Sequence, residues 1–362
     1  MAARIAVLGA SGFVGSRLVE QWQLTGWAQV RPVVRQVGSL ARLARFDLDW
    51  RLADACDQGA LTAAFQDCDA VVNLIVGNPE VIVANAIASY RAAEAAGVKR
   101  IVYLSSASVH GQAPAAGTDE NSLLNTRHKF AYNNAKVRAE RALHQLRARG
   151  SLELVILRPG IVFGPRSRWV SDLADQLLDD RAYLINEGRG ICNSIYVDNL
   201  IKAIQLAQTV PSADGEVFLV GDRERVSWLD FYSHIARGLG IDIDRIARLA
   251  APSFQRGRFE TIEAVRASRP VQALLPAVPT PLKQVAKGAI SALAEPPHRS
   301  PWRLADAPAP QVTEEMAELQ SCTVQLSWSK AERQLGYQPT VSFSQGMQRS
   351  IGWLKFAGYP AF

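Results

Sequence analysis

The chain has 362 residues, of which 48% are hydrophobic and 20% are charged, and its formal net charge is +6. This is the composition of a folded protein with one large or two modest domains, so a disordered or fibrous chain is excluded. No run of 18 apolar residues occurs, and we expect a cytoplasmic protein without a membrane span. Its four scattered cysteines and five histidines lack metal-ligand spacing, so we expect no disulfide framework and no metal site.

Up to residue 165, short apolar runs alternate with helical stretches, a pattern typical of βαβ units around a parallel sheet. The expected strands are 4–8, 29–34, 69–76, 100–104 and 152–157, and the expected helices are 14–22, 59–65, 82–96 and 132–149. The strands are runs of Val, Ile and Leu, as burial on both faces requires. We therefore predict an α/β fold with a Rossmann-like, doubly wound parallel sheet, in which residues 1–165 form a dinucleotide-binding domain.

Beyond residue 165 the pattern is less regular. The expected elements are helices at 169–179, 199–208 and 228–239, strands at 193–197 and 216–220, and two short helices within 327–358. We expect residues 193–220 to return to the first domain. Residues 166–362 are expected to form mainly a smaller C-terminal substrate-binding domain.

Residues 251–310 differ from the rest of the chain because they contain ten of its eighteen prolines. Between 252 and 304, eight Lys or Arg stand against three acids. We interpret this segment as an irregular, basic insertion with a short helix at 282–293. The remainder of the chain is close to neutral, so we expect no nucleic-acid partner. Three roles for the insertion stay open: a lid over a phosphate-bearing substrate, a solvated surface excursion, and a membrane contact.

A glycine-rich turn follows the first predicted strand and opens the first predicted helix. Its sequence is Gly9-Ala10-Ser11-Gly12-Phe13-Val14-Gly15. Glycines in this context allow a tight turn, a close approach of the backbone to a pyrophosphate, and close helix packing. The helix N-terminus adds N–H donors and positive partial charge. The turn therefore predicts a dinucleotide-binding loop.

Arg35 ends the second predicted strand, where NAD-specific folds carry an acid that binds the ribose hydroxyls. Its guanidinium would instead bind a 2′-phosphate, which favours NADP as the cofactor, with NAD as the alternative. A solvated arginine at a strand end is the other interpretation. Asp54 would hydrogen-bond the adenine amino group or serve only as a turn residue.

Tyr132 and Lys136 lie one helical turn apart, which places a phenol and an ammonium group on one face. A nearby cation favours the phenolate, so we expect Tyr132 to exchange protons with a substrate near neutral pH. Lys136 is also expected to hold the nicotinamide ribose. Ser106 follows a predicted strand, at the edge where open α/β sheets bind ligands.

Four motifs, in this order, resemble the extended short-chain dehydrogenase/reductase family, the group that contains nucleotide-sugar epimerases and dehydratases. They are Gly-x-x-Gly-x-x-Gly, Ser-Ser-Ala-Ser-Val-His-Gly from Ser105, Tyr-x-x-x-Lys, and Leu-Arg-Pro-Gly-Ile-Val-Phe-Gly-Pro from Leu157. Residues 195–200 and 329–346 are similar to later segments of that family, so the resemblance extends over nearly the whole chain.

The resemblance implies roles for particular residues. Ser106 would bind the substrate oxygen, Tyr132 would be the catalytic acid and base, and Lys136 would be its partner. The glycine loop and Pro159 would contact the cofactor. Asn85 and His110 are assigned less directly, as substrate contacts, and His110 replaces the family's usual tyrosine. The resemblance assigns no role within the insertion, where the basic side chains of Arg256, Arg258 and Arg266 are expected to bind a diphosphate.

The leading hypothesis is an NAD(P)-dependent oxidoreductase or epimerase that acts on a nucleotide sugar by hydride transfer at a sugar carbon. One alternative is a ketoreductase for a hydrophobic, steroid-like or phenylpropanoid-like alcohol. Another is a cofactor-binding scaffold or sensor without chemistry, against which the intact set of Ser106, Tyr132 and Lys136 argues. We expect a small-molecule substrate, and a homodimer stays open.

Overall fold

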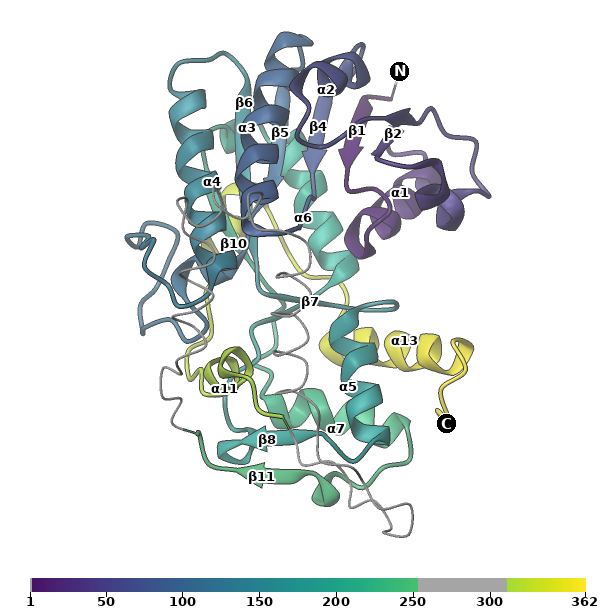
Figure 1. Cartoon of the computed structure of the whole chain (residues 1–362), viewed down its shortest axis with the longest axis vertical. Helices are drawn as coiled ribbons and strands as arrows, with labels where there is room; N and C mark the ends of the chain where they lie inside the picture. Colours follow the sequence, from purple (N-terminus) through teal and green to yellow (C-terminus); the bar gives the residue numbers. More distant parts are fainter. Residues whose placement is uncertain (1, 253–310) are drawn as a thin grey trace, which may run out of the picture. The chain divides into compact units, whose positions relative to one another are not determined.

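A seven-stranded parallel sheet organises the chain (Figure 1). The computed structural model describes residues 2–252 and 311–362. The strand order is β10-β6-β5-β4-β1-β2-β3. The strands are β1 (Arg4–Leu8), β2 (Gln29–Val34), β3 (Arg51–Leu52), β4 (Ala70–Asn73), β5 (Arg100–Leu104), β6 (Glu153–Pro159) and β10 (Val217–Val220). Because β1 lies between β2 and β4, the strand order reverses there, and ligands bind beyond the carboxyl ends of strands at such a point.

Helices cover both faces of the sheet because each buried strand has two apolar faces. Ile5 and Val7 of β1 belong to the core beneath one pair of helices, whereas Ala6 and Leu8 belong to the core on the other face. The first pair is α1 (Phe13–Thr25) and α6 (Val197–Thr209), and the second face carries α2 (Gln58–Phe65), α3 (Pro79–Ala95) and α4 (Ala131–Arg147). The predicted Rossmann-like, doubly wound fold is confirmed.

Most of the remaining elements lie beyond the carboxyl ends of the sheet strands (Figure 1), whereas α12 packs against β10 and α6. They include two small parallel sheets, β7 with β9 and β8 with β11. Their bounds are β7 (Ile161–Phe163), α5 (Arg168–Leu178), β8 (Tyr183–Ile185), β9 (Ser194–Tyr196), α7 (Trp228–Gly238), β11 (Ala247–Leu249), α11 (Glu314–Gln320), α12 (Ser329–Leu335) and α13 (Phe343–Phe356). Strands β7, β8 and β11 and helix α11 were not foreseen from the sequence. The helix expected at 282–293 lies outside the described residues.

A buried ion pair joins α4 to β6. Arg158 and Glu140 are almost completely buried, and the Arg158 Nη2 atom lies 2.6 Å from the Glu140 Oε2 atom. The Ser105 hydroxyl, just after β5, also donates to Glu140, and Arg158 donates to the backbone carbonyl of Glu120. The pair therefore ties together one helix, two strands and a loop at the carboxyl edge of the sheet.

Within the ranges 2–252 and 311–362, no helix combines the length and the apolar character needed to cross a membrane. The same residues contain no group of three or more His, Cys, Asp or Glu side chains arranged to hold a metal ion. Three of the four cysteines, Cys68, Cys192 and Cys322, are buried free thiols, whereas Cys56 is exposed.

We predict that Glu140→Ala lowers the free energy of unfolding by about 3–5 kcal/mol, because it leaves the Arg158 charge buried without its carboxylate. Urea unfolding followed by circular dichroism measures the loss. Glu153→Ala is the control, since Arg100 then keeps the carbonyl acceptors of Ala207 and Val210. A loss of about 1 kcal/mol or less is expected for that half-exposed partner. Equal losses in the two variants would show that burial does not set the strength of the pair.

Candidate active site

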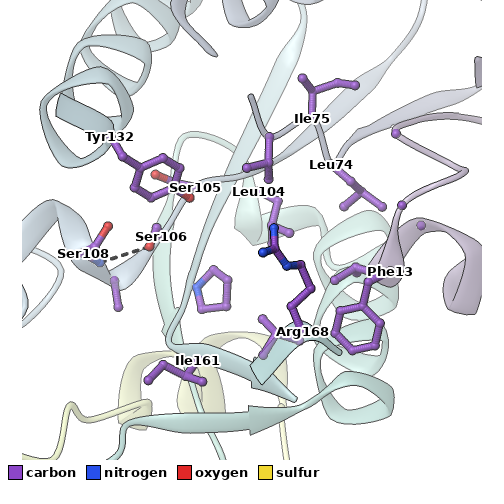
Figure 2. Close-up of a pocket in the computed structure, with 18 of the residues that line it drawn as sticks. Phe13, Leu74, Ile75, Leu104, Ser105, Ser106, Ser108, Tyr132, Ile161 and Arg168 are labelled. Carbon is purple, nitrogen blue, oxygen red and sulfur yellow. Dashed lines mark hydrogen bonds between the residues drawn. The ribbon is translucent and has the colours of Figure 1, made fainter. Parts of the chain in front are cut away.

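One cavity of about 860 Å³ brings the predicted cofactor loop and the predicted catalytic hydroxyls together. Its wall includes the glycine turn at one end, Ser106 and Tyr132 in the middle, and Trp169 and Trp228 at the other end. Figure 2 shows Tyr132 and Ser106 on one wall, with Phe13 across from them. The cavity lies at the carboxyl ends of β1, β4, β5 and β6, where the sheet topology predicts a ligand site.

The glycine turn has the geometry of an anion-binding loop. Gly9 has a φ of +78°, a conformation that favours glycine, and its carbonyl accepts the Gly12 N–H at 3.0 Å. A Cβ at Gly15 would collide with the Gly9 carbonyl oxygen and lie 2.8 Å from Ala10 Cα. This close approach seats the start of α1 directly against the turn.

The first turn of α1 contains no acidic side chain, and its cap residue, Gly12, offers no side-chain acceptor. The N–H groups of Phe13, Val14 and Gly15 have no hydrogen-bond acceptor among the described residues. These donors and the helix dipole together provide positive potential without a protein anion to satisfy it. The residues present therefore fit the pyrophosphate of a dinucleotide.

Arg35 and Asp54 line the same end of the cavity, and both are exposed. Arg35 follows β2 directly, and no ion pair joins it to another residue in the described ranges. The Asp54 Oδ1 atom accepts the Cys56 N–H at 2.8 Å, which fixes this carboxylate within its turn. The structure thus brings a cation and an anion to the expected adenosine end.

Tyr132 is the second residue of α4, and Ser106 follows β5 by two residues. The Ser106 Oγ atom accepts the Ser108 N–H at 3.1 Å, and this contact is drawn in Figure 2. Burial raises the pKa of Tyr132, while a hydrogen bond with Ser106 acts in the opposite direction and the charge of Glu315 raises it further. The phenol is therefore protonated at neutral pH, contrary to the expectation that a cation would lower its pKa.

The position of the Lys136 side chain explains why its charge does not lower the pKa of Tyr132. Its ammonium group is fully buried and donates to the Leu104 carbonyl at 2.8 Å, with the Tyr103 ring centroid 4.9 Å away. The Tyr132 ring centroid lies farther away, at 5.9 Å. Burial lowers the pKa of Lys136 to about 8. In this structure Lys136 lies behind Tyr132 and is not part of the cavity wall.

The other expected cofactor contacts, Ser11 and Pro159, line the cavity, whereas Asn85 and His110 do not. Asn85 is buried against the sheet, where its amide donates to the Ala55 carbonyl at 2.7 Å and accepts from Asn73. His110 packs against Arg158, and burial together with that charge lowers the pKa of His110 to about 4. The structure gives both residues structural partners in place of the substrate contacts expected from the resemblance. Arg256 and Arg258 lie outside the described residues.

Several wall residues were not singled out from the sequence. They are Arg168 and Trp169 of α5, Asn193, Trp228 of α7, and Glu315 and Leu319 of α11. Arg168 points into the cavity in Figure 2. The Gly164-Pro165 turn indicates where α5 begins, close to the end of β7. Helix α11 follows the insertion, and its sequence contains no motif. Its place at the cavity depends on tertiary packing alone.

Comparison with known proteins supports this geometry. The family model described as "NAD dependent epimerase/dehydratase family" matches residues 5–221. A UDP-glucose 4-epimerase from Vibrio cholerae is 27% identical over 250 residues, which cover 65% of this chain and 75% of that protein. A 3beta-hydroxysteroid-dehydrogenase/decarboxylase from Arabidopsis thaliana is 24% identical over 70% of this chain. This chain spans only 53% of that relative's length.

Solved structures have the same fold. A dTDP-glucose 4,6-dehydratase from Streptomyces venezuelae, with NAD and TYD bound, matches with a TM-score of 0.69 and 19% identity, over 98% of this chain and 97% of that one. A UDP-glucuronic acid 4-epimerase from Bacillus cereus, in complex with UDP-glucuronic acid and NAD, matches with a TM-score of 0.68 and 20% identity, over 98% and 99%. The family match covers more than half of the chain and confirms the resemblance found in the motifs. The chain belongs to the NAD dependent epimerase/dehydratase family.

Proposed function

We propose that this protein is an NAD(P)-dependent enzyme that oxidises a hydroxyl-bearing carbon of a nucleotide sugar, or reduces the corresponding carbonyl carbon, in an epimerisation, a dehydration or a net reduction. The observation that carries the proposal is the placement of Ser106 and Tyr132 in the wall of the cavity that the glycine turn also lines. A hydroxyl pair beside a dinucleotide site is the arrangement needed for coupled proton and hydride movement.

The cofactor would be held by the free N–H groups at the start of α1, which face its pyrophosphate, and by Arg35 and Asp54 at its adenosine end. When bound, the dinucleotide supplies the hydride acceptor or donor at its nicotinamide ring. The structural neighbours are NAD-bound, while the preference of this chain depends on Arg35.

Tyr132 would exchange the proton. Because burial keeps its pKa above the ordinary value, the phenol is protonated at neutral pH and can donate to a substrate carbonyl oxygen. The Ser106 hydroxyl would donate a second hydrogen bond to the same oxygen, which orients the substrate. Lys136 ties α4 to the end of β5 through the Leu104 carbonyl and would so hold the helix that carries Tyr132 in place.

The far end of the cavity supports a nucleotide sugar as the substrate. Trp169 offers aromatic surface for a base or for the apolar face of a sugar ring, and the buried Trp228 packs beside it. Arg168 provides a cation for a diphosphate, and Asn193 and Glu315 provide polar contacts for hydroxyl groups. The solved structures named for dTDP-glucose and UDP-glucuronic acid add to this support.

A ketoreductase for an apolar alcohol is the second candidate. Ile161, Val162, Leu319 and Leu326 line the same end and would contact such a substrate. The plant relative named as a 3beta-hydroxysteroid-dehydrogenase favours this alternative. Stabilisation of the folded protein by UDP-glucose or by a hydroxysteroid, each tested with cofactor, distinguishes the two classes, because a ligand of the folded state raises the melting temperature.

We predict that Tyr132→Phe lowers kcat by roughly 100-fold or more and leaves the Kd of the cofactor almost unchanged, because only the proton-carrying oxygen is lost. Turnover with UDP-glucose and calorimetric titration of NAD and NADP measure the two effects. Tyr359→Phe is the control, since that hydroxyl bonds Asp175 and is not part of the cavity wall. Retention of more than about a tenth of the wild-type kcat in Tyr132→Phe would contradict its role as proton donor.

We also predict that the wild-type protein binds NADP at least about tenfold more tightly than NAD, since one charge-assisted contact of Arg35 with the 2′-phosphate exceeds 1.4 kcal/mol. Arg35→Asp should reverse the preference. Arg42→Asp makes the same charge change at an exposed position outside the cavity wall and should leave the ratio unchanged. Equal affinities of the wild-type protein for NADP and NAD would show that Arg35 does not contact the 2′-phosphate. NAD would then be the preferred cofactor assignment.

A further inference from the structure

Glu315 places a carboxylate in the wall of the cavity that also contains Tyr132. It belongs to α11, which follows the insertion in the sequence and is anchored to the region just before α4. The Lys129 ammonium lies 2.8 Å from the Glu314 carboxylate and 2.7 Å from the Glu318 carboxylate. Helix α11 is therefore attached on either side of Glu315 in the sequence.

A chain of side-chain amides holds the Glu315 carboxylate. The Gln112 Nε2 atom donates to Glu315 Oε1 at 2.7 Å, and Gln112 Oε1 accepts from Asn133 Nδ2 at 3.1 Å. Asn133 is the residue next to Tyr132, and both amide side chains are buried. Within the described part of the chain, Glu315 Oε2 has no hydrogen-bond donor. One carboxylate oxygen is thus fixed by the protein, and the other is available to a ligand.

The charge of Glu315 acts on the reacting end of the cavity. It raises the pKa of Tyr132, which shows that its field reaches the phenol. The other charged side chains in the described wall are Arg35 and Asp54, at the adenosine end, and Arg168, which pairs with Asp172 at 3.3 Å. None of these three contributes to the pKa shift of Tyr132. On the cavity side of Tyr132, Glu315 is therefore the charged wall residue that acts on the phenol, whereas the Lys136 ammonium lies behind the ring and outside the wall.

We propose that Glu315 determines substrate specificity: it accepts a hydrogen bond from a hydroxyl group near the reacting carbon and excludes sugars that carry a carboxylate there. This inference rests on the proposed function. A carboxylate can only accept hydrogen bonds, so it favours a donor such as a sugar hydroxyl. A second carboxylate would be repelled, although Glu315 is exposed and solvent screens the pair in part. An apolar group would displace water from the free oxygen and supply no donor in its place.

The test compares the affinities for two probes, UDP-glucose and UDP-glucuronic acid, which differ only in the group on carbon 6. Calorimetry on the full chain, with NAD or NADP present, gives the ratio of their Kd values. We expect the wild-type protein to prefer UDP-glucose. Glu315→Gln, which keeps the shape and the contact with Gln112, should shift the ratio about tenfold toward UDP-glucuronic acid. Glu318→Gln removes the same charge from the same helix outside the cavity wall and should leave the ratio unchanged.

A second readout does not depend on the sugar probes. Because the Glu315 charge raises the pKa of Tyr132, Glu315→Gln should lower that pKa. Ultraviolet titration of phenolate absorbance measures it, and subtracting the curve of Glu315→Gln/Tyr132→Phe from that of Glu315→Gln isolates the signal of Tyr132. Binding of both probes with an unchanged ratio in Glu315→Gln would overturn the specificity role and leave the proposed function standing. Failure of both probes to bind any variant would overturn the proposed substrate class, and this inference with it.

Discussion

The buried pair of Arg158 and Glu140 determines how α4, the helix that carries Tyr132, meets the sheet. Tyr132, Lys136 and Glu140 occur at intervals of four residues and so share one face of α4. Glu140 bonds Ser105 and Arg158, while Lys136 bonds the carbonyl of Leu104. Two successive residues at the end of β5 thus anchor two successive turns of the helix. The position of Tyr132, one turn farther along, follows from these contacts.

The same pair limits the chemistry nearby. His110 lies against the Arg158 guanidinium, which disfavours a positive charge on the imidazole. A residue that the motif alone suggests as a substrate contact therefore belongs to the supporting structure. Glu315, which follows the sheet elements in the sequence, instead places a carboxylate in the cavity wall that contains Tyr132. Our proposals thus assign support to the Rossmann elements and recognition to the C-terminal segment.

Much of the sheet and of the cofactor end could be predicted from the sequence because both depend on local patterns. Continuous apolar runs identified β1, β2 and β5 at their observed bounds, and the glycine spacing identified the turn before α1. The three-residue strands β8 and β11 are too short to show any periodicity. Asn85 was misjudged as a substrate contact because its helical position was known but its partners on β4 were not.

The far wall of the cavity could not be predicted, since its residues come from segments distant in sequence. Trp169, Trp228 and Glu315 lie on three different helices and share no motif. Their proximity depends on packing among α5, α7 and α11, which single-sequence patterns do not report. The wall to which we assign the substrate contacts therefore comes from the part of the chain where the sequence is least informative.

Helix α11 has a consequence for how this chain tolerates change. Strand β11, the last element before residues 253–310, pairs with β8, and α11, the first element after them, returns to β8 through Gln320. Gln320 is buried, accepts the Ile185 N–H at 2.7 Å and donates to the Tyr183 carbonyl. The elements on either side of residues 253–310 are thus both attached to β8. The entropic cost of closing a loop between two fixed points grows slowly with loop length, by about 0.6 kcal/mol for each doubling. Insertions and deletions between these two anchors can accumulate while the wall that carries Glu315 keeps its place.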